Sequence, residues 1–304
     1  MASIDLNNKT LKEEKNYVSI LTTDLSSTYD LVDHKLLLRK LEFYGVKNSA
    51  IELLEDFLNN RKIFTQVQGF NSEIKDSENC SVIQGSKLTV FLHTIFLIEI
   101  PLIPKLMRDA QLIETLLELK IPQYYGIGYF VNQYIDDSTN IIGCSNKVEL
   151  QNYLKSYHEV LEEYYKANKL KLNSEKTKII VTKAKNNTND RSPVEFKTAE
   201  GETIREDNAI RILGFLKNNR DSYDSHLGQI NGRVCKVLSE IRPYLKHMNL
   251  KTRRETIYAK AASLLLYGSE LFTGQTEWTQ RKITSILIKC NREIYRKNWF
   301  KVSN

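Results

Sequence analysis

The sequence has few cysteines, the residues that stabilise small or secreted domains through disulfides or bound metal ions. Its four cysteines lie far apart and form no CxxC pair, at Cys80, Cys144, Cys235 and Cys290. Neither a zinc ribbon nor a disulfide framework is therefore indicated. The first ten residues, MASIDLNNKT, have neither a basic flank nor an apolar core, so we expect no secretion signal. We expect an intracellular protein, in the nucleus or the cytoplasm.

The sequence also lacks a long uninterrupted apolar run. The most apolar stretch, residues 88–104, is broken by His93, Glu99, Pro101 and Pro104. A membrane span needs about 20 predominantly apolar residues, so this stretch predicts a buried helix and no membrane partner. At 304 residues, the chain is long enough to bury a large core in one or two domains.

Negative charge is scarce in the last third of the chain. Residues 205–304 contain 19 Lys and Arg but only 9 Asp and Glu, a surplus of +10 in a chain whose net charge is +7. A localised positive field attracts phosphate polymers or acidic membrane surfaces. A solvated helical surface would have the same composition, so charge alone leaves both interpretations open.

Hydrophobic patterns predict a mixture of strands and helices. Alternation and β-branched residues indicate strands at residues 17–23, 63–68, 128–135, 139–144 and 178–182. Helical spacing indicates helices at residues 34–44 (with Asp33 as N-cap), 48–58, 105–119 and 146–170. Residues 185–192 (KNNTNDRS) predict a loop. An α+β fold with an antiparallel sheet follows.

The character of the chain changes near residue 220. Two short strand-like segments, residues 194–198 and 209–215, come before it. Three helical runs follow it, at residues 223–242, 250–267 and 278–296. We therefore predict one domain at residues 1–220 and a basic helical region at residues 221–304.

Three aspartates lie at the ends of predicted strands. Asp24 follows the first strand, and Asp136 and Asp137 lie at the tip of a predicted hairpin. Such carboxylates repel one another unless a cation lies between them, and Mg²⁺ prefers hard oxygen ligands. An Asp-Asp pair by itself is weak evidence, because hairpin turns favour aspartate for its local hydrogen bonds.

The sequence around these aspartates resembles the reverse transcriptases of non-LTR retrotransposons. TTDLSSTYDLVDHKLLLRKLEFYGV (residues 22–46) resembles motif A, and NRKIFTQVQGFNSE with SVIQGS resembles the strand and motif B that follow. YIDD (residues 134–137) resembles motif C, ANKLKLNSEKTKIIV (residues 167–181) motif D, and RILGF (residues 211–215) the motif before the thumb. The resemblance covers about residues 17–270 and keeps the family's order.

The resemblance implies a right-hand polymerase palm followed by a helical thumb. Asp24, Asp136 and Asp137 would be the catalytic carboxylates that hold two Mg²⁺ ions, with Mn²⁺ as an alternative. The ions would serve nucleotidyl transfer from a dNTP to a primer 3′-hydroxyl. The partners implied are RNA or an RNA/DNA hybrid.

Further roles follow from the matching positions. Tyr29 would lie under the sugar and exclude a 2′-hydroxyl, although core packing is the plainer interpretation. Gln84 and Gly85 would contact the incoming nucleotide and template, and a helix-leading turn is the alternative. Lys176 or Lys178 would neutralise charge on the triphosphate or protonate pyrophosphate, whereas most lysines are simply solvated.

The sequence also departs from the family. Only 23 residues precede Asp24, where the family has its fingers subdomain, so we expect a palm and thumb without fingers. Ile83 replaces a proline of motif B, and residues 88–90 lack the usual Gly-Pro. A protein that supplies fingers, or a ribonucleoprotein complex, is a further expected partner.

Three functions therefore compete. The first is an RNA-directed DNA polymerase that uses dNTPs. The second is an inert protein that keeps the fold and binds RNA or acts as a scaffold, with Arg253, Arg254 and Lys260 as candidate nucleic-acid contacts. The third, a helical protein-interaction module, depends only on the amphipathic runs after residue 223.

Overall fold

The computed structural model describes residues 1–25, 27–59, 61–76, 79–108, 127–135, 137–183, 192–272 and 276–295. The chain divides into two compact units, Asn7–Asp207 and Met1–Leu6 together with Asn208–Asn304. The division of the sequence into a palm at residues 1–220 and a thumb at 221–304 stays a prediction. The predicted loop at residues 185–192, apart from Ser192, and most of the predicted helix at 105–119 lie outside the described residues.

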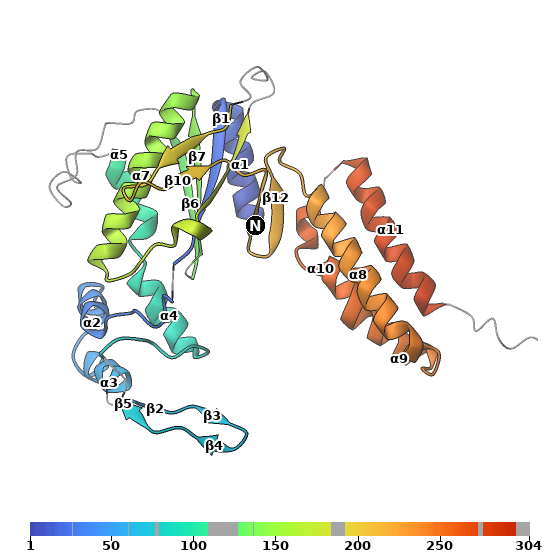
Figure 1. Ribbon diagram of the computed structural model, residues 1–304, viewed down its shortest axis with the longest axis horizontal. Helices are drawn as coiled ribbons and strands as arrows, with labels where there is room; N and C mark the ends of the chain where they lie inside the picture. The colour runs from blue at the N-terminus through green and yellow to red at the C-terminus, as the bar shows by residue number, and fades with distance from the viewer. Residues whose placement is uncertain are drawn as a thin grey trace, which may run out of the picture. The chain divides into compact units, whose positions relative to one another are not determined.

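A four-stranded antiparallel sheet is the centre of the larger unit. Its order is β6 (Gly128–Tyr134), β7 (Asp137–Cys144), β1 (Tyr17–Thr23) and β8 (Lys178–Lys183). The structure confirms the predicted α+β fold and the hairpin of β6 and β7 (Figure 1). In β1, every residue but Thr22 is buried, which explains its apolar and β-branched sequence, YVSILTT.

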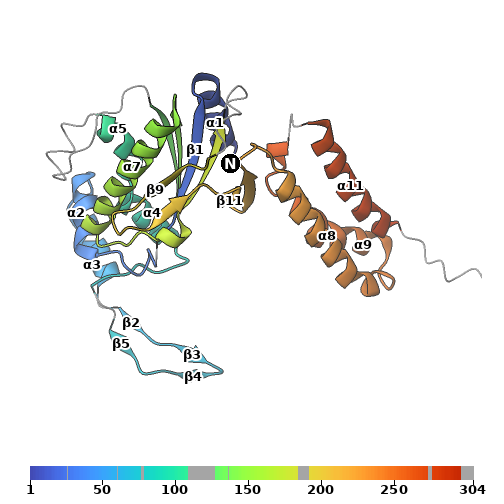
Figure 2. The ribbon, with the colours of Figure 1, turned by 45° about the horizontal axis from the view of Figure 1, so that its top comes forward.

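Helices cover both faces of this sheet (Figures 1 and 2). The long helix α7 (Lys147–Ala167) begins at Asn146, whose side chain accepts a hydrogen bond from the Glu149 N–H, and it buries Leu154, Tyr157 and Leu161. Helix α1 (Ala2–Glu14) packs Leu11 against the glycines of the hairpin. A Cβ at Gly128 would lie 2.3 Å from Leu11 Cδ2, so this close approach requires glycine.

A helical layer follows β1 in the chain. It contains α2 (His34–Phe43), α3 (Ser49–Leu58), α4 (Lys87–Phe96) and α5 (Ile103–Arg108), with the short helix η1 (Ile100–Leu102) between α4 and α5. Asp33 caps α2 as predicted, because its Oδ1 accepts a hydrogen bond from the Leu36 N–H at 2.9 Å. Gly45, with φ of 97°, follows the end of this helix.

The apolar segment Lys87–Met107 is long and hydrophobic enough to cross a membrane by length and composition alone. The structure divides this segment into α4, η1 and α5 and buries Leu92, Phe96, Ile100 and Met107 in the core of the unit. Burial of side chains of this kind contributes about 1.5–3 kcal/mol each. A core position therefore accounts for the hydrophobicity of these buried residues, whereas Phe91 and Leu102 of the same segment are exposed.

The predicted strand at residues 63–68 is part of a ribbon of short strands. β2 (Lys62–Ile63) pairs with β5 (Lys75–Asp76), and β3 (Gln66–Val67) pairs with β4 (Phe70–Asn71). The ribbon extends away from α3 (Figure 1). Its apolar side chains stay exposed, at Ile63, Phe64, Val67, Phe70 and Ile74.

Short strands complete the sheet structure of the chain. β9 (Glu195–Lys197) pairs with β10 (Thr203–Arg205). A strand at residues 194–198 was predicted from the sequence, but none was predicted at β10. In the smaller unit, β11 (Ala209–Ile212) pairs with β12 (Phe215–Asn218). The turn between β11 and β12 contains Gly214, with φ of 87°.

Helices make up the rest of the smaller unit. They are α8 (Asp224–Leu245), α9 (Leu250–Ile257), the π-helix η3 (Tyr258–Ala262), α10 (Ser263–Leu266), η4 (Ser269–Phe272) and α11 (Glu277–Ile294). Their core includes Ile230, Val234, Ile257 and Ile286. Lys217 is also buried here, and its ammonium lies 2.6 Å from Asp5 Oδ1, so its charge is compensated.

Candidate active site

One end of the central sheet brings two of the predicted catalytic residues together. β1 and β7 are antiparallel, and Thr23 lies opposite Ser138. The paired register ends there, so Asp24 follows it on one strand and Asp137, the first residue of β7, precedes Ser138 on the other. Both aspartates therefore lie at the same end of the sheet, whereas Asp136 lies outside the described residues.

The hairpin that carries Asp137 contains a strained residue. Tyr134 pairs with Asp137, so residues 135 and 136 make the connection. Ile135 has a φ of 58°, in the left-handed region that is costly for a β-branched side chain. The Gln133 side-chain amide donates a hydrogen bond of 2.8 Å to the Ile135 carbonyl. The fold thus stores backbone strain next to its predicted carboxylates.

Asp24 is held by contacts on both its backbone and its side chain. Its carbonyl accepts a hydrogen bond of 3.0 Å from the Asn173 N–H, and its Oδ1 accepts one of 3.0 Å from the Leu25 N–H. Its Oδ2 lies 2.7 Å from Lys176 Nζ. The carboxylate is about a quarter exposed, so its position is fixed while solvent still reaches it.

Lys176 comes from a short turn between α7 and β8. This turn is the 3-10 helix η2 (Ser174–Lys176), and the Asn173 side chain caps it by accepting a hydrogen bond from the Lys176 N–H. Thr177 Oγ1 also donates to the Asn173 carbonyl at 3.0 Å. The structure therefore brings Lys176, rather than the alternative Lys178, to Asp24.

Tyr29 lies at the edge of the core. Its ring stacks on His93 of α4, with centroids 4.5 Å apart, and it is half-buried. Its carbonyl accepts a hydrogen bond of 2.8 Å from the Val82 N–H. These contacts agree with core packing. The role of Tyr29 in sugar selection stays a prediction.

Gln84 and Gly85 lie in the turn before α4. Both are exposed, and Gly85 has a φ of 92°, which explains the glycine at this position. A Cβ there would meet nothing within 4 Å, so conformation rather than crowding selects it. Contact of these two residues with a nucleotide or template stays a prediction.

A polar cluster joins the start of α2 to the segment before that turn. His34 Nε2 lies 2.7 Å from the Ser81 carbonyl, and Arg61 Nη2 donates to the same carbonyl at 2.8 Å. Lys169 Nζ lies 2.6 Å from Asp33 Oδ2. Burial by itself raises the pKa of Asp33, but the hydrogen bonds from Lys169 and the start of α2 outweigh burial and lower it.

A second, partly buried network surrounds Glu99, and no pattern in the sequence indicated it. Its carboxylate accepts hydrogen bonds from Lys40 (2.7 Å), Tyr164 (2.7 Å) and Tyr44 (2.9 Å). Burial by itself raises the pKa of Glu99, and these three donors together lower it below 4.5. Burial also lowers the pKa of Lys40 from 10.5, against the attraction of Glu99. The short contact favours the ionised pair.

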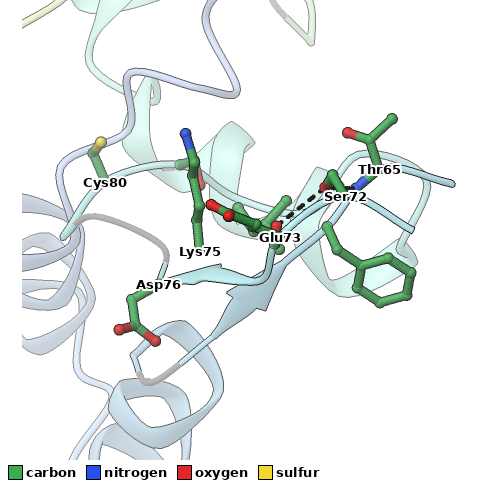
Figure 3. Close-up of a pocket in the computed structure, with 9 residues that line it drawn as sticks. Thr65, Ser72, Glu73, Lys75, Asp76 and Cys80 are labelled. Atoms are coloured by element: carbon green, nitrogen blue, oxygen red, sulfur yellow. Dashed lines mark hydrogen bonds between the residues drawn. The ribbon is translucent and has the colours of Figure 1, made fainter. Parts of the chain in front are cut away.

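A pocket of about 650 Å³ lies along the ribbon β2–β5, beside Cys80 and Ser81 (Figure 3). Glu73, Lys75 and Asp76 line it, and Ser72 Oγ accepts a hydrogen bond from the Thr65 N–H at 2.9 Å. Its lining contains neither Asp24 nor Tyr29. The pocket is therefore separate from the carboxylate end of the sheet.

The three basic residues predicted to bind nucleic acid lie in the smaller unit, in different surroundings. The Arg253 guanidinium donates to the carbonyls of Leu245, Met248 and Ile294, at 3.1, 3.4 and 3.3 Å. These bonds satisfy backbone acceptors near the ends of α8 and α11. Arg254 and Lys260 are exposed, and the Arg254 guanidinium lies 5.7 Å from the centre of the Tyr258 ring.

The carboxylates suit a hard divalent cation chemically. Asp24 and Asp137 lie at one end of the sheet, and carboxylate oxygens are ligands that Mg²⁺ prefers. Among the described residues, no three His, Cys, Asp or Glu side chains form a group that could hold a metal ion. Asp136, the third predicted ligand, is not among those residues, so the predicted set stays a prediction.

Comparison with known protein families decides what this sheet belongs to. Residues 1–216 match the family described as reverse transcriptase (RNA-dependent DNA polymerase). The chain belongs to the reverse transcriptase family. The match includes Asp24, Tyr29, the YIDD hairpin and Lys176. A search of curated proteins found no match.

Solved structures of telomerase have a low similarity to this chain. A truncated apo telomerase from Candida tropicalis gives a TM-score of 0.45 at 14% identity, covering 74% of this chain and 39% of that one. Telomerase from Candida albicans with a fragment of telomeric RNA gives 0.41 at 11% identity, covering 95% and 52%. The chain thus spans about half or less of these telomerase chains.

Proposed function

We propose that this member of the reverse transcriptase family is an RNA-directed DNA polymerase of the non-LTR retrotransposon type. The observation that supports the proposal is the register of β1 and β7, which ends beside Asp24 and Asp137 within the region that matches the family. The palm-and-thumb interpretation is part of the proposal. So is the requirement for RNA or an RNA/DNA hybrid, and for dNTPs.

Each residue has a stated part in this proposal. Asp24, Asp136 and Asp137 would hold two Mg²⁺ ions, which when bound activate the 3′-hydroxyl and neutralise the leaving pyrophosphate. Tyr29 would limit the space under the sugar and so favour dNTPs. Lys176, whose ammonium already reaches this end of the sheet, would neutralise charge on the triphosphate.

Primer extension with dNTPs on RNA and DNA templates tests the proposal. We expect extension by the wild-type protein with Mg²⁺, and its loss in Asp24→Asn and Asp136→Asn. Asp56→Asn, on the exposed face of α3, is the matched control and should keep full activity. Extension that survives Asp24→Asn and Asp136→Asn would remove these carboxylates from the chemistry.

The alternative is an inert member of the family that binds RNA or acts as a scaffold. The altered motif B supports it, because Ile83 replaces a proline there and is 45% exposed. This alternative predicts salt-dependent RNA binding by the wild-type protein without nucleotide incorporation.

A further inference from the structure

Two carboxylates at the same end of a sheet favour a compensating charge nearby. Asp24 follows the last residue of β1, and Asp137 is the first residue of β7, at the end where Thr23 lies opposite Ser138. The Lys176 ammonium, 2.7 Å from Asp24 Oδ2, supplies positive charge at this point. It therefore occupies the Oδ2 side of Asp24, one of the positions that a divalent cation bound to this carboxylate would take.

The way Lys176 is held allows it to leave this position. Its backbone is fixed, because Asn173 caps η2 and donates its N–H to the Asp24 carbonyl. Its side chain is 61% exposed and reaches Asp24 through a flexible four-carbon stem. An exposed ion pair of this kind contributes little free energy, so a divalent cation can compete with it.

We infer that Lys176 is the resident counter-cation of the site: its ammonium neutralises Asp24 when no metal is bound and moves away when a divalent cation binds. This inference rests on the proposed function, since it requires Asp24 to be a metal ligand. Lys176 is then a positioning residue that weakens metal binding in the absence of substrate. Once displaced, its ammonium is available to an incoming triphosphate, so charge at the site stays balanced.

Direct metal titration without nucleotide or nucleic acid tests the inference. Mn²⁺ binding to the full chain is measured by electron paramagnetic resonance of the free ion. Lys176→Met removes the charge and keeps the stem, and should tighten Mn²⁺ binding about two- to fivefold, the worth of an exposed ion pair. Lys176→Arg should bind Mn²⁺ like the wild type.

Controls separate this inference from the metal site itself. Lys171→Met, at an exposed lysine of the same connection, makes the same change in net charge and should leave Mn²⁺ affinity unchanged. Asp24→Asn should weaken binding sharply. If Asp24→Asn has no effect, or the wild-type protein binds no Mn²⁺, the proposed site and the inference both fail. If Asp24→Asn weakens binding but Lys176→Met binds as the wild type or more weakly, only the inference fails.

Thermal unfolding of each variant shows whether a change in binding is local. Asn173 keeps its hydrogen bond to the Asp24 carbonyl in Lys176→Met, so this variant should stay folded. The ratio of Mn²⁺ affinities between Lys176→Met and the wild type should change little with added monovalent salt. Salt screens charges that lie far apart more than it screens a direct contact. An equal gain in Lys171→Met would assign the result to net charge and overturn the inference.

Discussion

The ammonium of Lys176 lies 2.7 Å from Asp24 Oδ2 and so joins the turn before β8 to the end of β1. A second, independent contact joins the same two segments, because the Asn173 N–H donates to the Asp24 carbonyl at 3.0 Å. The two segments are thus joined by a backbone hydrogen bond that does not depend on the ion pair. Removing the charge of Lys176 should change the electrostatics of the site without changing its geometry.

Tyr29 offers a test that separates sugar selection from packing. Tyr29→Ala should relax the preference for dNTPs over NTPs, because the bulk under the sugar is lost. It should also lower the free energy of unfolding by roughly 1–3 kcal/mol, since the stack on His93 is lost from a half-buried position. Tyr29→Phe keeps the ring and should keep the preference for dNTPs. The measurements are kcat/KM for each nucleotide class and urea unfolding; lower stability with unchanged selectivity would make Tyr29 a packing residue.

Glu99 predicts a pH dependence of stability. Its folded pKa lies below the ordinary 4.5, so its contribution is present above that pH and is lost as the pH falls through the lowered value. Glu99→Gln should therefore cost roughly 1–3 kcal/mol at pH 7, and the gap from the wild type should narrow in acid. Urea unfolding at pH 7 and pH 3.5 measures this, with the exposed Glu42→Gln as control. A gap that widened on acidification would contradict the prediction.

Arg253 and Arg254 are adjacent but should behave differently. Arg253→Lys keeps the charge but loses the fork that reaches three backbone carbonyls, so it should lower the stability by about 1–2 kcal/mol, visible as a lower Tm. Arg254→Gln, at an exposed position, should leave Tm unchanged and weaken RNA binding with a smaller salt slope. Filter binding over a salt series and thermal unfolding distinguish the two; the reverse pattern would refute these assignments.

Ile135 predicts a stabilising substitution. Asn tolerates the left-handed conformation better than a β-branched residue, so Ile135→Asn should raise the free energy of unfolding by about 0.5–1 kcal/mol. The midpoint of urea denaturation measures this gain. If the strain positions the carboxylates, the same variant should lose activity while gaining stability. A less stable variant would show that the isoleucine side chain contributes more by its contacts than its conformation costs.

The local elements of this protein follow from short-range physics, so the sequence predicts them. The apolar, β-branched run at residues 17–23 forms β1, and Asp33 caps α2 because its carboxylate needs only the N–H three residues ahead. The hairpin of β6 and β7 follows from alternation on either side of two turn residues. Strand β10 was missed, because its three residues carry too short a pattern.

The tertiary structure decided what depends on contacts between distant segments. Nothing local in the sequence makes Lys176 rather than Lys178 the partner of Asp24; the pairing follows from η2, whose cap turns Lys176 toward the end of β1. The donors of Arg253 go to carbonyls at two helix ends, which only helix packing brings together. The sequence by itself determined the strands of the central sheet, the Asp33 cap and the family motifs, because these depend on neighbours in the chain. The sheet register and the partners of each charge needed the fold, because burial and distance select among many equivalent side chains.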